Sequence, residues 1–141
     1  MMPLCEDQGV GVIPWSPLAR GRLARPLGET TVRSETDGVG KVLYKDDDAA
    51  DGAIITALAE IAVAKGAKMA SLGLAWHFTK GVAAPIIGAS KAHHIDDAVA
   101  ALDIELTAQE IASLEGPYRP KWPTGLAMPM APMDQVTVKQ G

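Results

Sequence analysis

Two short apolar runs restrict the folds that this sequence can adopt: Val10-Gly11-Val12-Ile13, closed by Pro14, and Pro85-Ile86-Ile87. Continuous runs rich in β-branched residues are typical of strands buried on both faces of a parallel sheet. The order along the chain is strand, loop, helices, strand, turn, helix and helix, which predicts an α/β fold of βα units around a parallel sheet. A buried parallel pair needs neighbouring strands, however, and the sequence offers two strands in all. It therefore reads as a piece of something larger.

Four helices are predicted from apolar spacing and from signals at their ends. The first ends near Gly66, and Asp46-Asp47-Asp48 stands at its start, where the helix dipole favours negative charge. The second covers about Met69 to Thr79, and the third crosses residues 95–102. The fourth follows Thr107-Ala108-Gln109-Glu110, which has the pattern of a capping box. These helices account for most of the predicted regular structure.

The remaining segments carry signals for irregular structure. Residues 19–33 form a basic loop interrupted by glycine and proline, and residues 30–47 read as irregular, with one helical turn around Lys41 to Tyr44. From Gly116 onward prolines recur too often for a regular helix. We expect this end of the chain to be loop and then disorder.

The composition limits the classes of function. The chain has 141 residues, an apolar content of 48% and a formal net charge of −4. These values suit one globular domain or part of one, and the interspersed charges argue against nucleic acid or an anionic membrane as a partner. Cys5 is the single cysteine, which excludes an intrachain disulfide, and it is expected to be inert. Because no apolar run approaches the about 20 residues of a membrane helix, we expect a cytoplasmic protein.

The stretch GVGVIPWSPLARGRL, Gly9 to Leu23, begins like a glycine-rich nucleotide fingerprint. Its third glycine is missing, because Pro14 stands where the pattern GxGxxG requires glycine. Spacing alone favours a simple turn at Ser16-Pro17, with the basic residues after it as a solvated loop, over a cofactor-binding turn. A tryptophan that follows a buried strand, as Trp15 does, is usually a core anchor. The residues by themselves leave these alternatives open.

His93, His94, Asp96 and Asp97 gather four side chains of the metal-binding type in five positions. Adjacent residues of a helix point about 100° apart, so they rarely bind one ion. We therefore expect no metal site here. His77 lies between two aromatic residues and is expected to be packed or half-buried.

Three segments of the sequence, taken together, resemble the aldo-keto reductases, the NADP(H)-dependent (β/α)8-barrel oxidoreductases. They are GVGVIPWSPLARGRLARP (9–26), MASLGLAWHFTKGVAAPIIGAS (69–90) and APIIGASKAHHIDDAVAALDIELTAQEIASLE (84–115). The agreement is collinear over about residues 1–125. It implies a partial TIM barrel: the seventh and eighth strands, the helices after them and a C-terminal helix. Residues 126–141 match no family segment and are expected to be an irregular or disordered tail.

The resemblance implies that the turn after the seventh strand binds NADP(H). Trp15 would line the floor of the nicotinamide pocket, and Gly21 would let the backbone approach the cofactor closely. Arg22, together with Arg20, would supply positive charge. The residues implied in binding at this turn are Trp15, Ser16, Pro17, Leu18, Gly21 and Arg22.

The resemblance also implies that the turn after the eighth strand binds the adenosine 2′-phosphate, which separates NADP from NAD. Free N–H groups at the start of the following helix point at an incoming anion. His94 would add a donor that depends on imidazole protonation, and Asp97 stands where the family usually has a glutamate facing the adenine. The residues implied at this turn are Gly88, Ser90, Lys91, His94 and Asp97.

The family's catalytic Asp, Tyr, Lys and His have no matching positions in this sequence. In the family a hydride passes from the nicotinamide to a carbonyl and yields an alcohol. We therefore expect this chain to be the cofactor-binding C-terminal part of such a reductase, with a small carbonyl substrate for the complete enzyme and no activity alone. The alternative is a non-enzymatic truncated fragment, or a half-barrel interaction module that associates with a second copy.

Overall fold

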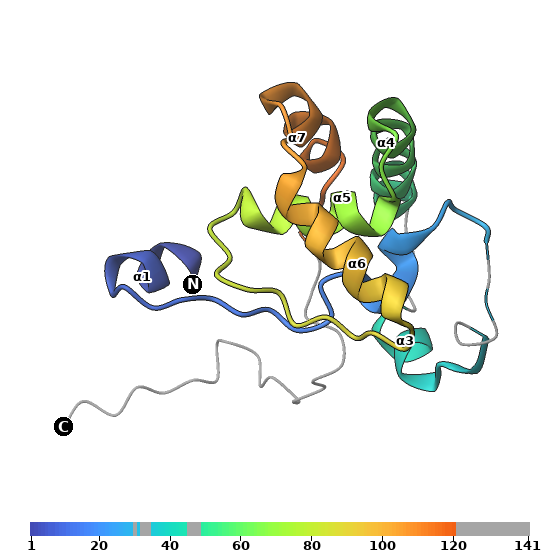
Figure 1. Cartoon of the computed structure of the whole chain (residues 1–141), viewed down its shortest axis with the longest axis horizontal. Helices are drawn as coiled ribbons and strands as arrows, with labels where there is room; N and C mark the ends of the chain where they lie inside the picture. The colour runs from blue at the N-terminus through green and yellow to red at the C-terminus, as the bar shows by residue number, and fades with distance from the viewer. Residues whose placement is uncertain (30, 32–34, 45–48, 121–141) are drawn as a thin grey trace, which may run out of the picture.

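A computed structural model of the chain describes residues 1–29, 31, 35–44 and 49–120, and these are mostly helical (Figure 1). The described helices begin with α1 (Met2–Asp7) and the short 3₁₀ helix η1 (Ala19–Ala24). The others are α3 (Gly38–Leu43), α4 (Ala49–Lys65), α5 (Met69–Phe78), α6 (Ala92–Ala100), the 3₁₀ turn η2 (Ala101–Asp103) and α7 (Ala108–Glu115). The four helices predicted from apolar spacing are thus confirmed as α4 to α7.

The hydrophobic core lies where α4, α5 and α7 meet. Leu72 of α5 is completely buried and Leu58 of α4 is 2% exposed. Leu114 brings α7 onto the same core, and Trp76 and Leu23 pack against its edge. The other buried members of this core are Ile55, Ala62 and Met69. Since α5 contacts α4, α6 and η1, it is the central element of the molecule.

The start of α7 has the capping box that the sequence predicts. The Thr107 Oγ1 accepts a hydrogen bond from the Glu110 N–H at 3.2 Å, and Glu110 Oε2 accepts one from the Thr107 N–H at 2.7 Å. Two otherwise unsatisfied donors of the first turn are thereby paired. Glu110 also pairs with Lys65 at 3.0 Å, which fastens α7 to the end of α4.

The two predicted strands are extended segments joined by a single parallel bridge between Trp15 and Ile86. The Ala83 N–H donates to the Val12 carbonyl and the Ile86 N–H donates to the Pro14 carbonyl, each at 2.9 Å. The expected parallel pairing is therefore present, over one bridge rather than a ladder.

The prediction that these segments are buried is wrong. Val10 is 58% exposed, Ile13 60%, Ile86 52% and Ile87 37%. In the described part of the chain no further strand flanks the pair and no core cluster includes these side chains. A parallel pair is buried only when neighbouring strands and helices cover it, and these residues cannot supply that cover themselves.

Other boundaries differ from the sequence prediction. The predicted loop 19–33 contains η1, and the helical turn expected around Lys41 to Tyr44 begins earlier, at Gly38. It begins there because the Asp37 side chain accepts a hydrogen bond from the Gly40 N–H and caps α3. The run 46–48 and the tail 126–141 lie outside the described residues.

Candidate functional site

The parallel bridge brings two turns to the same end of the extended pair (Figure 1). Ser16 follows Trp15 directly, and Gly88 follows Ile86 by two residues. Because the two extended segments are parallel, the turns that follow them begin at the same end of the pair. Both η1, which follows the first turn, and α6, which follows the second, pack on α5. The two turns that the sequence singles out are therefore placed together by one bridge and one helix.

The first turn has an unusual backbone. Ser16, Ala19 and Arg20 have φ values of 52°, 47° and 56°, and Gly21 has a φ of 95°. Left-handed residues other than glycine are uncommon and cost free energy. The Ser16 Oγ accepts a hydrogen bond from the Arg20 N–H at 3.2 Å across the turn. The turn is thus a tight, locally bonded structure and not an open loop.

The apolar residues of this turn divide between core and surface. Pro17 is buried and Leu18 is half-buried. Leu18 packs over Gly73 of α5, where an added Cβ would lie 3.1 Å from Leu18 Cδ2. Trp15 is 66% exposed, so its ring is not a core anchor in this structure.

The arginines of the turn contact the two residues that flank α3, Asp37 before it and Tyr44 after it. Arg20 makes a bidentate ion pair with Asp37, with Nε–Oδ2 at 2.5 Å and a second hydrogen bond to Oδ1 at 2.8 Å. The hydrogen bond to Asp37 raises the pKa of Arg20. The Arg22 guanidinium lies 5.0 Å from the centre of the Tyr44 ring, a cation–π distance. Burial raises the pKa of Tyr44, and the positive charges of Arg22 and Arg20 oppose that shift.

The second turn is open to solvent. Gly88, Ser90 and Lys91 are exposed, and Lys91 occupies the position before the first residue of α6. The Ser90 N–H donates to His94 Nδ1 at 3.3 Å, and the His94 ring packs edge-on against His93 with centroids 4.5 Å apart. The hydrogen bond requires an unprotonated Nδ1, since a protonated imidazole nitrogen cannot accept.

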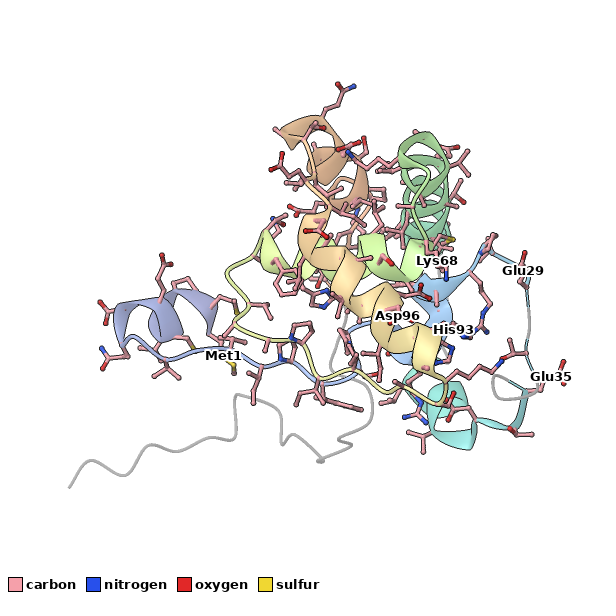
Figure 2. All side chains as sticks on the ribbon, viewed as in Figure 1. Met1, Glu29, Glu35, Lys68, His93 and Asp96 are labelled. Atoms are coloured by element: carbon pink, nitrogen blue, oxygen red, sulfur yellow. The ribbon has the colours of Figure 1, made fainter. Side chains whose placement is uncertain are left out.

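Asp97 is turned to α5. Its Oδ1 accepts from Lys68 Nζ at 2.6 Å, and its carbonyl accepts from the Ser71 hydroxyl at 2.7 Å. Figure 2 shows Lys68 at the start of α5, next to α6 with His93 and Asp96. Across the described residues, no three His, Cys, Asp or Glu side chains converge on a point where a metal ion could bind.

The family model for the aldo/keto reductase family matches residues 1–118 of this chain. The chain belongs to the aldo/keto reductase family. It is 43% identical over 123 residues to versiconal hemiacetal acetate reductase of Aspergillus parasiticus, a match that covers 86% of this chain and 36% of the relative. It is 42% identical over 123 residues to an aldo-keto reductase of Fusarium vanettenii, covering 86% and 33%. An aldo-keto reductase of Alternaria alternata matches at 41% over 120 residues, covering 84% and 32%.

This member of the aldo/keto reductase family spans about a third of the length of the curated relatives it matches. Both turns and the helices α4 to α7 fall within the matched residues. No helix in the described residues combines the length and hydropathy that crossing a membrane requires.

Sequence reasoning did not single out Asp37, Tyr44 or Lys68, although each contacts a predicted site residue or its neighbour. For Asp37 a signal was present, since Asp-Gly before a short apolar stretch is a helix-start pattern. For Tyr44 and Lys68 the contacts depend on how distant segments meet.

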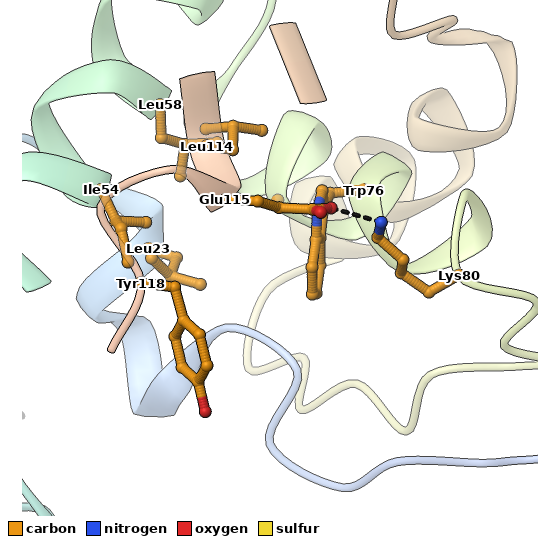
Figure 3. A pocket seen from close by; sticks show the side chains of 9 residues that line it. Leu23, Ile54, Leu58, Trp76, Lys80, Leu114, Glu115 and Tyr118 are labelled. Carbon is orange, nitrogen blue, oxygen red and sulfur yellow. Dashed lines mark hydrogen bonds and ion pairs between the residues drawn. The ribbon is translucent and has the colours of Figure 1, made fainter. Parts of the chain in front are cut away.

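This member of the family also has an apolar cavity of about 480 Å³ between α4, α5 and α7 (Figure 3). At its wall, Glu115 pairs with Lys80 and accepts a hydrogen bond from Trp76 Nε1 at 2.9 Å. The contact with Lys80 is the larger cause, and that with Trp76 the smaller, of a lowered pKa of Glu115. None of the predicted cofactor residues lines this cavity, whose lining residues are Leu23, Ile54, Leu58, Gly73, Trp76, Lys80, Leu114, Glu115 and Tyr118.

Proposed function

We propose that this chain is the cofactor-binding C-terminal part of an NADPH-dependent aldo-keto reductase, formed by the last two βα units of a (β/α)8 barrel. The observation that carries the proposal is the parallel bridge between Trp15 and Ile86, which puts the two turns at one end of the pair. In (β/α)8 barrels, ligands bind at the carboxyl ends of the strands, and the loops after the last two strands frequently form the phosphate site.

The donor groups at the second turn suit a dianionic phosphate. Ser90 and Lys91 are exposed where α6 begins, so a hydroxyl, an ammonium group and backbone N–H groups are available to an anion. Because His94 Nδ1 accepts from the Ser90 N–H, the proton of the neutral ring is on Nε2, which can donate to an anion. We assign Gly88, Ser90, Lys91 and His94 to the 2′-phosphate of NADPH.

At the first turn, the exposed ring of Trp15 is available to the nicotinamide, and Ser16, Pro17, Leu18 and Gly21 form the backbone that follows it. Arg22 keeps a guanidinium beside this turn. The bound nicotinamide supplies the hydride in the complete enzyme, and this chain's residues bind and orient it. Asp97 faces Lys68 in the structure, so its contact with the adenine would require that ion pair to open.

The first test compares NADPH with NADH as stabilisers of the chain. NADPH should raise the melting temperature, and NADH should raise it much less, because a ligand stabilises the state to which it binds. Lys91→Ala should remove the difference between the two nucleotides, since it removes a charge partner of the 2′-phosphate. The melting temperature with each nucleotide is the measurement.

Lys65→Ala is the matched control for that test, because Lys65 is a helical lysine that pairs with Glu110, away from both turns. It should leave the preference for NADPH intact. An unchanged preference in Lys91→Ala would contradict the phosphate assignment, and the absence of any nucleotide effect on the unaltered chain would contradict the proposed function.

A second candidate function has one observation in its favour. The apolar side chains of the extended pair are exposed, with Ile13 at 60% and Ile86 at 52%. Such a surface is suited to pairing with a second copy. In this second proposal the chain is a half-barrel interaction module without enzymatic activity, which associates with a second copy and binds neither NADPH nor NADH.

A further inference from the structure

The left-handed conformation of the first turn needs an external support. Three non-glycine residues in this region, Ser16, Ala19 and Arg20, have positive φ values. Such conformations persist only where the surroundings determine them, and they gather at ligand clamps.

The strongest support comes from Asp37, 17 residues further along the chain. Its carboxylate receives both the Nε and a terminal nitrogen of Arg20, at 2.5 and 2.8 Å, in the fork geometry that is most specific for arginine. The Asp37 side chain is 10% exposed and the Arg20 side chain 26%, so the pair is partly shielded from water. The Arg20 backbone, in turn, is the one that donates to Ser16.

The Asp37 carboxylate is fixed from its other side as well. Its Oδ1 accepts a hydrogen bond from the Gly40 N–H at 2.9 Å, which anchors it to the first turn of α3. A Cβ at Gly40 would come within 2.6 Å of Asp37 Oδ2, so glycine is needed for this close approach. Asp37 is therefore a rigid support for Arg20.

Tyr44, directly after α3, provides a second support. Its ring lies under the Arg22 guanidinium, 5.0 Å from the ring centre. Tyr44 thus contacts the end of the turn at Arg22, while Asp37 contacts Arg20 within it.

We propose that Asp37 is a positioning residue for the cofactor turn: through its bidentate pair with Arg20 it holds Ser16 to Arg22 in the conformation that binds the nucleotide. This rests on the proposed function. It assigns Arg20 a structural role, since its charge is already matched by Asp37 and both oxygens of that carboxylate occupy its fork. Tyr44 assists by supporting Arg22.

The test is the affinity of Asp37→Asn for NADPH and NADH, measured by titration calorimetry on the full chain. Asparagine keeps the size of the side chain and loses its charge, so the turn should loosen and both nucleotides should bind about tenfold more weakly. Because the first turn serves the part that the two nucleotides share, the ratio of their affinities should stay the same. Arg20→Lys should act alike, since lysine keeps the charge and loses the fork.

A direct role of Arg20 in binding the cofactor predicts the opposite change in nucleotide affinity. If Arg20 were a charge partner of the cofactor phosphates and Asp37 merely competed for it, Asp37→Asn would tighten binding, and Arg20→Lys would be nearly neutral. Either result overturns the positioning role, and so does unchanged affinity in Asp37→Asn.

Two controls separate this proposal from other failures. Asp37→Glu, which restores the carboxylate, should recover part of the affinity, whereas loss of folding would show as a lower melting temperature without nucleotide and no recovery. If the unaltered chain binds neither nucleotide, the proposed function fails, and the positioning role fails with it. If the unaltered chain and Asp37→Asn bind the nucleotides with the same affinity, the positioning role is overturned and the proposed function is not.

Discussion

At the residue scale, the burial of Leu72 dominates the stability of the helical core. Its side chain is completely buried where α4, α5 and α7 meet. Leu72→Ala should lower the free energy of unfolding by about 2–5 kcal/mol, because it removes apolar contacts and leaves a cavity. Urea denaturation would measure the change. Val63→Ala, at an 83% exposed position of α4, should have little effect, and equal losses in the two variants would contradict this core.

Single residues also show where sequence reasoning stops. The helices that carry Leu58 and Leu114 were predicted from apolar spacing, because helical periodicity is a local property. The ion pair between Arg20 and Asp37 did not follow, because it joins segments whose path between them has no periodic signal. The exposure of Trp15 was equally hidden, since it depends on what surrounds the extended pair.

At the element scale, the capping box of α7 makes the stability of the protein depend on pH. The hydrogen bond from the Thr107 backbone, followed by the contacts with Lys65, lowers the pKa of Glu110 below its ordinary value of 4.5. A depressed pKa in the folded state stabilises the protein above the ordinary value, and that contribution disappears as the pH falls through the folded-state pKa. Glu110→Gln should therefore melt lower than the unaltered chain at neutral pH.

The difference in melting temperature between the unaltered chain and Glu110→Gln should close as the pH is lowered beneath 4.5. Melting curves over a series of acid buffers would follow it. Glu105→Gln, an exposed acid on the segment before the capping box, serves as the control and should not reproduce the pattern. A gap that stays constant with pH would show that the box does not act through the charge of Glu110.

The helices were predicted more completely than the extended segments, and the difference has a physical reason. The helices α4 to α7 carry their own signals, such as the Thr107 cap and the glycine with φ 62° at position 66 that ends α4. The extended segments carry the composition of buried strands, and their parallel pairing was predictable from it. Their burial was not, because it is a property of neighbouring strands and not of the segments. The candidate site was predicted from the sequence through the family resemblance, whereas the ion pair between Arg20 and Asp37 was visible in the structure alone.

At the scale of the whole molecule, the extended pair with its exposed apolar side chains should govern the behaviour of the isolated chain. We expect self-association that grows with protein concentration, since burial of Val10, Ile13 and Ile86 against a second copy removes apolar surface from water. Sedimentation velocity over a range of concentrations would measure it.

Ile13→Thr should weaken this association, and Val63→Thr is the matched control, because Val63 is also β-branched and apolar and is a more exposed residue on α4. A chain that stays monomeric at every concentration would contradict the expectation. Equal weakening by the two substitutions would show that the association is not confined to the extended pair.

The contact between Asp37 and Gly40 has a consequence for how this sequence can change over generations. An alanine at position 40 would meet the Asp37 carboxylate, and that carboxylate cannot step aside without releasing Arg20. Replacement of any one of the three residues thus removes a contact on which the arrangement of the other two depends. Among descendants of this sequence, Arg20, Asp37 and Gly40 should be inherited or lost as a group, so the three positions together amount to one heritable character.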